Sequence, residues 1–237
     1  MGSGDAFGSG GRRQACILLS DGETSVLLDC GTTSLVGLKA LGIDPNSIGA
    51  VFISHLHGDH FGGIPFLVLD GQFSRREAPL AVLGPPGTTK RLNETMEALF
   101  PGSTAVERKF AVEVTEMAAG ADYEFAGIAA RAYLADHASG ASAHILRVEW
   151  QRRVIAYSGD TAWTPALAAA SRGSALLICE AYFLDKKVQY HLSYGELLEH
   201  LAEVDAKRIV LTHMTGEMIA AADVELERAF DGMVIEL

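Results

Sequence analysis

The run His55-Leu56-His57-Gly58-Asp59-His60 constrains this chain more than any other feature of its sequence. It places four side chains of metal-ligand type directly after the apolar stretch 50–53, which we expect to be a buried strand. Two imidazoles two positions apart can bind one ion, while Asp59 and His60 turn towards a second and Gly58 permits the tight backbone. A cluster of this kind is hard to explain as core packing, so the sequence predicts a metal site.

Further ligand-type residues follow other apolar runs. His137 comes after 129–134, Asp160 after 154–157, and His213 after 209–211. Taken singly, these three have ordinary alternatives: a surface histidine, a turn residue and a satisfied core histidine. Their joint occurrence after predicted strands favours loops that converge on one point.

Strands and helices interleave along the whole chain, which predicts an α/β layered fold. No linker divides the sequence, and we expect one domain over residues 1–237. Ser193 and Glu196 form the pattern of a capping box at the start of a helix. The expected strands are 15–19, 25–28, 50–53, 80–83, 129–134, 145–150, 154–157, 175–178 and 209–211, and the expected helices are 35–41, 88–100 and 193–204.

The composition indicates which cellular compartment is expected for the protein and which binding partners are disfavoured. The formal net charge is -11, and long-range repulsion from such a surface disfavours nucleic acid as a partner. The three cysteines lie far apart in or beside apolar runs and are expected to be buried, reduced thiols. We expect a cytoplasmic protein without a membrane partner, because no stretch is long and apolar enough to span a bilayer and no signal-peptide pattern is present. A glycine-rich run follows Met1; such a loop usually follows a strand, and whether a first strand is missing or replaced stays open.

These motifs resemble the metallo-β-lactamase superfamily. The resemblance rests on segments 25–31, 52–63, 136–137, 157–161 and 211–213. It implies an αββα four-layer sandwich with a dinuclear site at one edge, and an aspartate, Asp29, that braces the metal loop. By position, the resemblance implies that His55, His57 and His137 hold one ion, that Asp59, His60 and His213 hold the other, and that Asp160 bridges the two. Zinc is the expected ion from the ligand types, with manganese or iron as alternatives.

Within the superfamily, segments 142–148, 179–183 and 191–193 are similar to the ribonuclease Z-like phosphodiesterases. The resemblance implies metal-activated hydroxide attacking a phosphodiester, with Asp59 helping to hold the water and His191 assisting the leaving group. The net charge of -11 and the absence of a tRNA-gripping arm favour a small phosphodiester, cyclic diesters included, over tRNA. His144 stands where the branch has a tyrosine, and its place in a strand suggests packing. The interval from His137 to Asp160 holds only a hairpin-sized segment, so the long arm that grips tRNA in ribonuclease Z is not expected there.

Several other functions stay open at this point. The same site opens lactones, thioesters and β-lactams in relatives of this kind, and tRNA 3′ processing is a less favoured reading. A sulfur-dioxygenase type of redox enzyme shares the ligands, whereas a non-catalytic metal-binding protein would be marked by a lost ligand, and none is lost. We expect a small-molecule substrate, and the sequence leaves a homodimer open.

Overall fold

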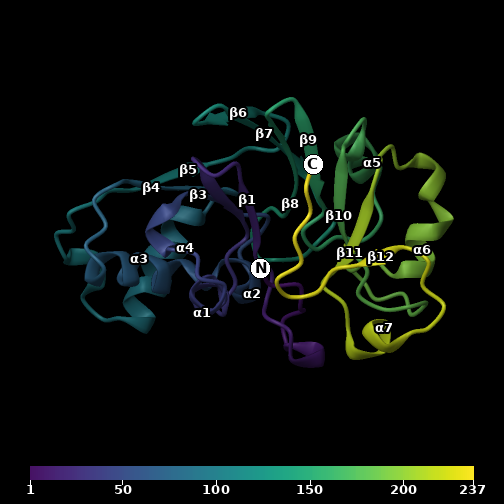
Figure 1. Cartoon of the computed structure of the whole chain (residues 1–237), viewed down its shortest axis with the longest axis horizontal. Coiled ribbons are helices and arrows are strands. Elements are labelled where there is room, and N and C mark those ends of the chain that lie inside the picture. Colours follow the sequence, from purple (N-terminus) through teal and green to yellow (C-terminus); the bar gives the residue numbers. More distant parts are fainter.

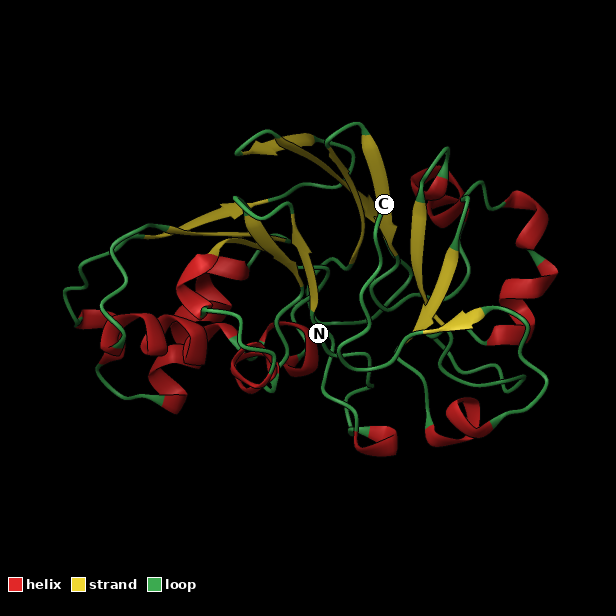
Figure 2. Ribbon diagram, viewed as in Figure 1, coloured by secondary structure: helices red, strands yellow, loops and turns green.

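The computed structural model describes residues 1–237 and contains two β-sheets that face one another, with helices on their outer sides (Figures 1 and 2). The first sheet has five strands in the order β1-β2-β3-β4-β5, with β1 at Ile17–Ser20, β2 at Ser25–Leu28, β3 at Ile48–Phe52, β4 at Leu80–Gly84 and β5 at Val112–Glu116. The second has seven in the order β12-β11-β10-β9-β8-β7-β6, with β6 at Asp122–Phe125, β7 at Ile128–Leu134, β8 at His144–Trp150, β9 at Arg153–Tyr157, β10 at Leu176–Glu180, β11 at Ile209–Thr212 and β12 at Glu227–Arg228.

The helices divide between the two sheets along the sequence. Those associated with the first sheet are α1 (Ser34–Ala40), α2 (Gly58–Phe61), α3 (Ile64–Phe73) and α4 (Thr88–Leu99), and those with the second are α5 (Pro165–Ser171), α6 (Tyr194–Glu199) and α7 (Gly216–Ala220). Short 3₁₀ turns lie at Ser9–Gly11, Pro45–Ser47, Ser103–Ala105 and Leu201–Glu203. None of these helices combines the length and the apolar character needed to traverse a membrane.

Three apolar clusters correspond to the three interfaces of a four-layer sandwich. The central cluster joins the inner faces of the two sheets and includes Phe52 and Leu146. The second lies between the first sheet and its helices and includes Leu67, and the third lies between the second sheet and its helices and includes Leu167. Strands buried on both faces need apolar residues at nearly every position, which is the composition of β3, β4 and β10. The predicted αββα arrangement is therefore confirmed.

Parallel pairing brings the ends of many strands to one edge. Strands β2 to β5 are parallel to one another, and so are β9 to β12. The loops that follow β2, β3, β7, β9, β10 and β11 carry the ligand-type residues identified in the sequence. The edge of the sandwich where these loops meet is the natural place for a site.

The structure corrects some expectations about local elements. The helix expected over 193–204 ends at Glu199 and continues after His200 only as a 3₁₀ turn. Ser193 does cap it, because its hydroxyl accepts from the Glu196 amide at 3.2 Å, but the return bond of a capping box is absent. Helix α3 was not predicted because its first six residues, from Ile64 to Leu69 in Ile-Pro-Phe-Leu-Val-Leu, are all apolar and show no helical periodicity.

Glycines in the metal loop differ in importance. A Cβ at Gly63 would lie 2.1 Å from the Gly31 carbonyl oxygen, so close backbone packing requires glycine there. The expectation for Gly58 was wrong, since its φ is not positive and a Cβ at that position would meet nothing within 4 Å. The cysteine prediction is confirmed: Cys16, Cys30 and Cys179 are all buried and free.

Candidate metal centre

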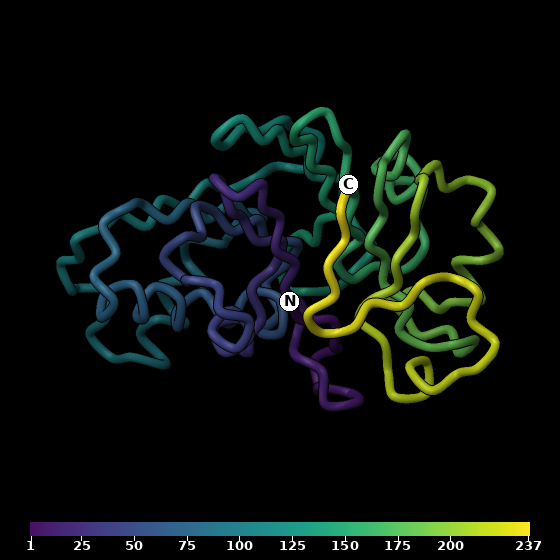
Figure 3. The backbone as a smooth tube through the Cα atoms, in the orientation of Figure 1, coloured from purple at the N-terminus to yellow at the C-terminus, as the bar shows by residue number.

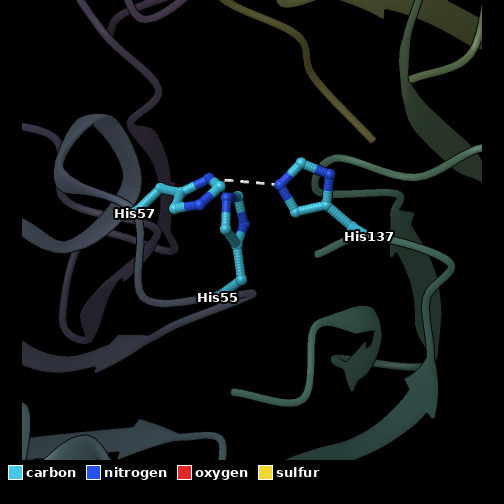
Figure 4. Close-up of side chains that lie close together, drawn as sticks. All are labelled: His55, His57 and His137. Carbon is cyan, nitrogen blue, oxygen red and sulfur yellow. Dashed lines mark hydrogen bonds between the residues drawn. The ribbon is translucent and has the colours of Figure 1, made fainter. Parts of the chain in front are cut away.

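Three histidines form the first half of the site. His55 and His57 follow β3, and His137 follows β7 in the opposite sheet. The Nδ1 atom of His57 lies 3.1 Å from Nε2 of His137, and all three side chains point towards one another (Figure 4). One nitrogen of each ring falls within 4.8 Å of the others, which is close enough for a single ion to bind all three.

A second group of four residues lies beside the first and is buried. The Nε2 atoms of His60 and His213 are 3.3 Å apart, and each lies 3.2 Å from the same oxygen of Asp59. Asp160 completes this group, with Oδ1 at 3.2 Å from His60 Nε2. The chain thus brings together every metal-ligand candidate that the sequence suggested.

Asp160 faces both groups. Its Oδ1 atom is directed towards His60, while its Oδ2 atom is 3.8 Å from Nε2 of His55 in the first group. Gly159 makes this placement feasible, because its φ is +56° and a Cβ there would lie 2.7 Å from that of Ser54. The geometry is that of a carboxylate which can bridge two ions.

Asp29 holds the metal loop in position. Its two oxygens accept from the Ser54 amide and hydroxyl at 2.7 Å each, from the Tyr157 hydroxyl at 2.8 Å and from His60 Nδ1 at 2.6 Å. Ser54 and His60 belong to the loop after β3, whereas Tyr157 belongs to the opposite sheet. One buried carboxylate therefore fastens the loop to both sheets.

The same hydrogen bonds determine which ring nitrogens are free. His60 Nδ1 must donate, since its partner is a carboxylate, and His137 Nδ1 must donate to the Tyr190 carbonyl at 3.0 Å. Ser54 gives its only hydroxyl proton to Asp29, so it accepts from His55 Nδ1 at 3.1 Å. In all three histidines the Nε2 lone pair is then directed into the cluster, as ligation requires.

Three residues at the site have a strained backbone conformation. Asp29, Tyr190 and His213 have φ values of +59°, +70° and +56°, in the left-handed region that non-glycine residues seldom adopt. Such conformations cost about 1–3 kcal/mol each and persist where the surroundings impose them. Here they orient the Asp29 carboxylate, the Tyr190 carbonyl and the His213 ring towards the cluster.

The donor set fits divalent metal ions. Tetrahedral zinc with Zn–N bonds of 2.0–2.1 Å sets two ligand nitrogens about 3.3 Å apart, and the two close nitrogen pairs here are separated by 3.1 and 3.3 Å. The His55 Nε2 and Asp160 Oδ1 atoms are buried without a hydrogen-bond partner. Buried polar atoms without partners are costly, and a shared cation would satisfy them.

The buried carboxylates and histidines of the cluster compensate one another's charges. Burial alone would raise the pKa of Asp160, but His213, His60 and His55 hold that pKa well below its usual value. Burial lowers the pKa of His55, so this ring is neutral and available as a ligand. The site therefore presents ionised carboxylates and at least one unprotonated imidazole, the forms that bind metals.

His191 lies next to the cluster and is held by Glu180. Its Nδ1 atom donates to Glu180 Oε1 at 2.5 Å, and its ring stacks on Tyr182 with centroids 4.7 Å apart. Although burial opposes it, Glu180 raises the pKa of His191 above its usual value. The ring of His137 is 5.0 Å away, centroid to centroid, so His191 borders the histidine and aspartate cluster from one side.

The role of Glu180 was missed in the sequence. The carboxylate is completely buried, and besides His191 it accepts from the backbone amides of Thr161 and Leu192 at 3.0 and 3.3 Å. Its position at the end of β10, like that of the ligands after other strands, was the signal that could have identified it.

His144 does not belong to the cluster. It begins β8, is buried, and neither ring nitrogen has a hydrogen-bond partner. Burial lowers the pKa of His144 to about 4, so the ring is neutral and packs as an apolar group. This agrees with the expectation that it serves packing.

The chain is similar in sequence to one protein family and to several ribonucleases Z. The family model described as "Anti-Pycsar protein Apyc1" matches residues 1–233. Ribonuclease Z of Mycobacterium marinum (strain ATCC BAA-535 / M) is 25% identical over 244 residues, covering 94% of this chain and 88% of the relative. Ribonuclease Z of Methanosarcina acetivorans is 24% identical over 268 residues, covering 91% and 86%.

Solved structures share the fold over the full length. Human tRNase Z, short form, superposes with a TM-score of 0.81 at 24% identity, covering 99% of this chain and 96% of that one. The metallo-β-lactamase fold protein YhfI from Bacillus subtilis gives 0.77 at 20% identity, covering 99% and 97%. A diphosphatase from the PhnP family gives 0.79 at 18% identity, covering 100% and 95%. The fold is that of the metallo-β-lactamases.

Proposed function

The chain belongs to the family of the anti-Pycsar protein Apyc1, and from this premise we propose that it is a metal-dependent phosphodiesterase acting on a small phosphodiester, cyclic diesters included. Support comes from the two ligand groups joined by Asp160, together with a histidine–carboxylate pair beside them. Relatives named Ribonuclease Z point to the same bond type. The observation that carries the proposal is the His191–Glu180 pair, since a proton donor beside such a centre suits expulsion of an alkoxide.

Seven residues would hold two divalent ions, with zinc as the proposed metal: His55, His57 and His137 for one, Asp59, His60 and His213 for the other, and Asp160 for both. When bound, such a pair supplies Lewis-acid polarisation of a phosphoryl oxygen and hydroxide at neutral pH.

The protein's own residues position the attacking water and the leaving group. Asp59 is the most exposed member of the second group, with 9% of its surface accessible, and its carboxylate can accept a hydrogen bond from an attacking water. His191, fixed by Glu180, can donate a proton to the departing oxygen from Nε2. The bond to Glu180 keeps Nδ1 occupied, so the donor atom and its direction are defined.

A panel of substrates tests the proposed reaction directly. Bis-p-nitrophenyl phosphate, a cyclic nucleotide, a lactone and a thioester should be offered at equal concentration with zinc or manganese added. We expect kcat/KM to be highest for a phosphodiester. A higher value for the lactone or thioester would refute the phosphodiesterase assignment while leaving the metal site intact.

Two metal equivalents per chain are expected. Seven ligand-type residues converge, whereas one tetrahedral ion needs three or four. Elemental analysis after gentle purification should approach two, and incubation with a chelator should remove both the metal and the activity. His137→Ala should lower the content towards one, because it belongs only to the first group. A content of one in the unaltered protein would contradict the two-ion assignment.

His191→Ala is expected to lower kcat without lowering metal content. General-acid assistance is typically worth about 10²–10⁴-fold, and the loss should be greatest for an alkyl leaving group, because p-nitrophenolate departs without a proton. Steady-state kinetics with an alkyl and a p-nitrophenyl diester measures the difference. His200→Ala is the matched control, since His200 stacks on Trp163 outside the cluster. Equal losses for both diesters, or loss of metal, would contradict the acid role.

Precursor tRNA is the competing substrate suggested by the names of the relatives. We expect slow, non-specific cleavage at most, because the interval between His137 and Asp160 contains only the β8–β9 hairpin and its flanking loops, and the net charge is -11. A gel assay at low salt measures it. Specific 3′ cleavage at the rate found for a small diester would overturn this expectation.

We place the activity in the cytoplasm, where thiols stay reduced. The three buried free cysteines support this location.

A further inference from the structure

The loop between β10 and α6 passes beside the metal cluster. Its residues 181–193 contain no helix or strand, and their path is drawn in green in Figure 3. Near the end of the loop the chain makes a tight turn over Val188–His191, in which the His191 amide donates to the Val188 carbonyl at 3.2 Å. This turn is the part of the loop that reaches the ligand histidines.

The third residue of this turn is of an unexpected type. Tyr190 has a φ of +70°, whereas the φ of Gln189 is not positive, which is the pattern of a type II turn. Such a turn normally has glycine or asparagine at this position, because other residues are strained when φ is positive. The contact that Tyr190 makes with the cluster comes from its backbone carbonyl and not from its ring, which is partly exposed. The strained backbone, and not the tyrosine side chain, is therefore the feature to explain.

The turn lies between two side chains of the site and contacts both. The Tyr190 carbonyl accepts from His137 Nδ1 at 3.0 Å, and the next residue, His191, donates from its own Nδ1 to Glu180. The peptide unit between Tyr190 and His191 has both of its polar groups engaged, since its carbonyl binds His137 and its amide closes the turn on Val188. A ligand of the first histidine group is thus joined through one peptide unit to the proposed proton donor.

The proton on His137 decides whether this link is made. When His137 binds an ion through Nε2, its proton must stay on Nδ1, where it donates to the Tyr190 carbonyl. When no ion is bound, the neutral ring can instead carry its proton on Nε2, which lies 3.1 Å from His57 Nδ1 and can donate to it. In that second tautomer the Tyr190 carbonyl receives no hydrogen bond from His137, and this contact no longer opposes the backbone strain.

We propose that the Val188–His191 turn couples binding of an ion at the first histidine group to the placement of His191, with Tyr190 as the positioning residue. In the ion-bound protein His137 holds the Tyr190 carbonyl, the strained turn stays closed, and His191 keeps its bond to Glu180. Without the ion the turn opens and His191 leaves this position. Such a coupling is reciprocal, so a change that disfavours the closed turn must also weaken ion binding. The inference rests on the proposed function, because it requires an ion at the first group.

Two substitutions that both remove the Tyr190 ring test the coupling. Tyr190→Asn introduces a residue that tolerates a positive φ, whereas Tyr190→Val introduces a β-branched residue that does not. Zinc is titrated into the metal-free full chain. We expect Tyr190→Val to weaken one of the two equivalents about 10–100-fold, as loss of a hydrogen-bond partner of a ligand usually does, and Tyr190→Asn to stay within about threefold of the unaltered protein.

Hydrogen exchange of the His191 amide reports the state of the turn itself. Zinc should slow this exchange at least about tenfold in the unaltered protein and in Tyr190→Asn, but less than about twofold in Tyr190→Val. The matched control is Arg152→Val, because Arg152 has a φ of +63° in the turn between β8 and β9, at the ends of these strands away from the cluster. This control should keep both the zinc affinity and the zinc-dependent protection of His191.

Three results would overturn the inference alone. If zinc binds the unaltered protein at two equivalents but leaves the exchange of His191 unchanged, the turn is not coupled to the ion. If Tyr190→Val and Tyr190→Asn bind zinc equally well, the backbone conformation of Tyr190 is not what supports His137. If Arg152→Val weakens zinc binding as much as Tyr190→Val, the effect is a general loss of stability. Failure of the unaltered protein to bind zinc would instead refute the metal site of the proposed function, and this inference with it, so the two failures are distinguishable.

Discussion

Asp160→Ala is expected to reduce turnover about 10³-fold or more. Its two oxygens face different ligand groups, so its loss removes several kcal/mol of charge compensation from both ions. We also expect metal content to fall below two equivalents and the Tm of the metal-loaded protein to decrease, because bound metal stabilises the folded state by mass action. Elemental analysis, kcat and thermal denaturation measure the three effects.

The matched control is Asp136→Ala. Asp136 neighbours the ligand His137 in sequence, but its side chain is exposed and makes no hydrogen bond. The control should retain its metals and most of its activity. If Asp160→Ala behaved like this control, Asp160 would be only a turn residue, which was its ordinary alternative in the sequence.

Asp29→Ala is expected to lower the free energy of unfolding by about 3–5 kcal/mol. The change leaves the Ser54 amide and hydroxyl, the Tyr157 hydroxyl and the His60 imidazole without their shared acceptor in a fully buried place. Alanine also tolerates a φ of +59° less well than aspartate. Urea denaturation of the metal-free protein measures the loss apart from any effect of bound metal.

The same substitution should weaken metal binding about 10–100-fold, since it releases the ring of His60. Tyr157→Phe is the control, because it removes only one of the four hydrogen bonds and should cost about 1 kcal/mol. A stability loss for Asp29→Ala no larger than that of the control would contradict its role as the brace between the sheets.

Local sequence was sufficient for the strands that carry the site. Runs such as 50–53 and 209–211 are short, apolar and rich in branched residues, and they coincide with observed strands: β3 contains residues 50–52 and β11 contains residues 209–211. Local sequence was insufficient for α3, because its consecutive apolar residues give no helical periodicity. It also did not predict the end of α6, where the chain continues as a 3₁₀ turn.

The sequence by itself determined which residue types are available for metal binding and that they follow strands, because ligand chemistry and strand patterning are both local. It left His137 and His213 with ordinary alternatives, since whether two rings meet depends on loops distant in the chain. Only the tertiary structure decided that Asp160 faces both groups and that Glu180 holds His191. Each of these depends on the register and the packing of two sheets, and no single segment contains that information.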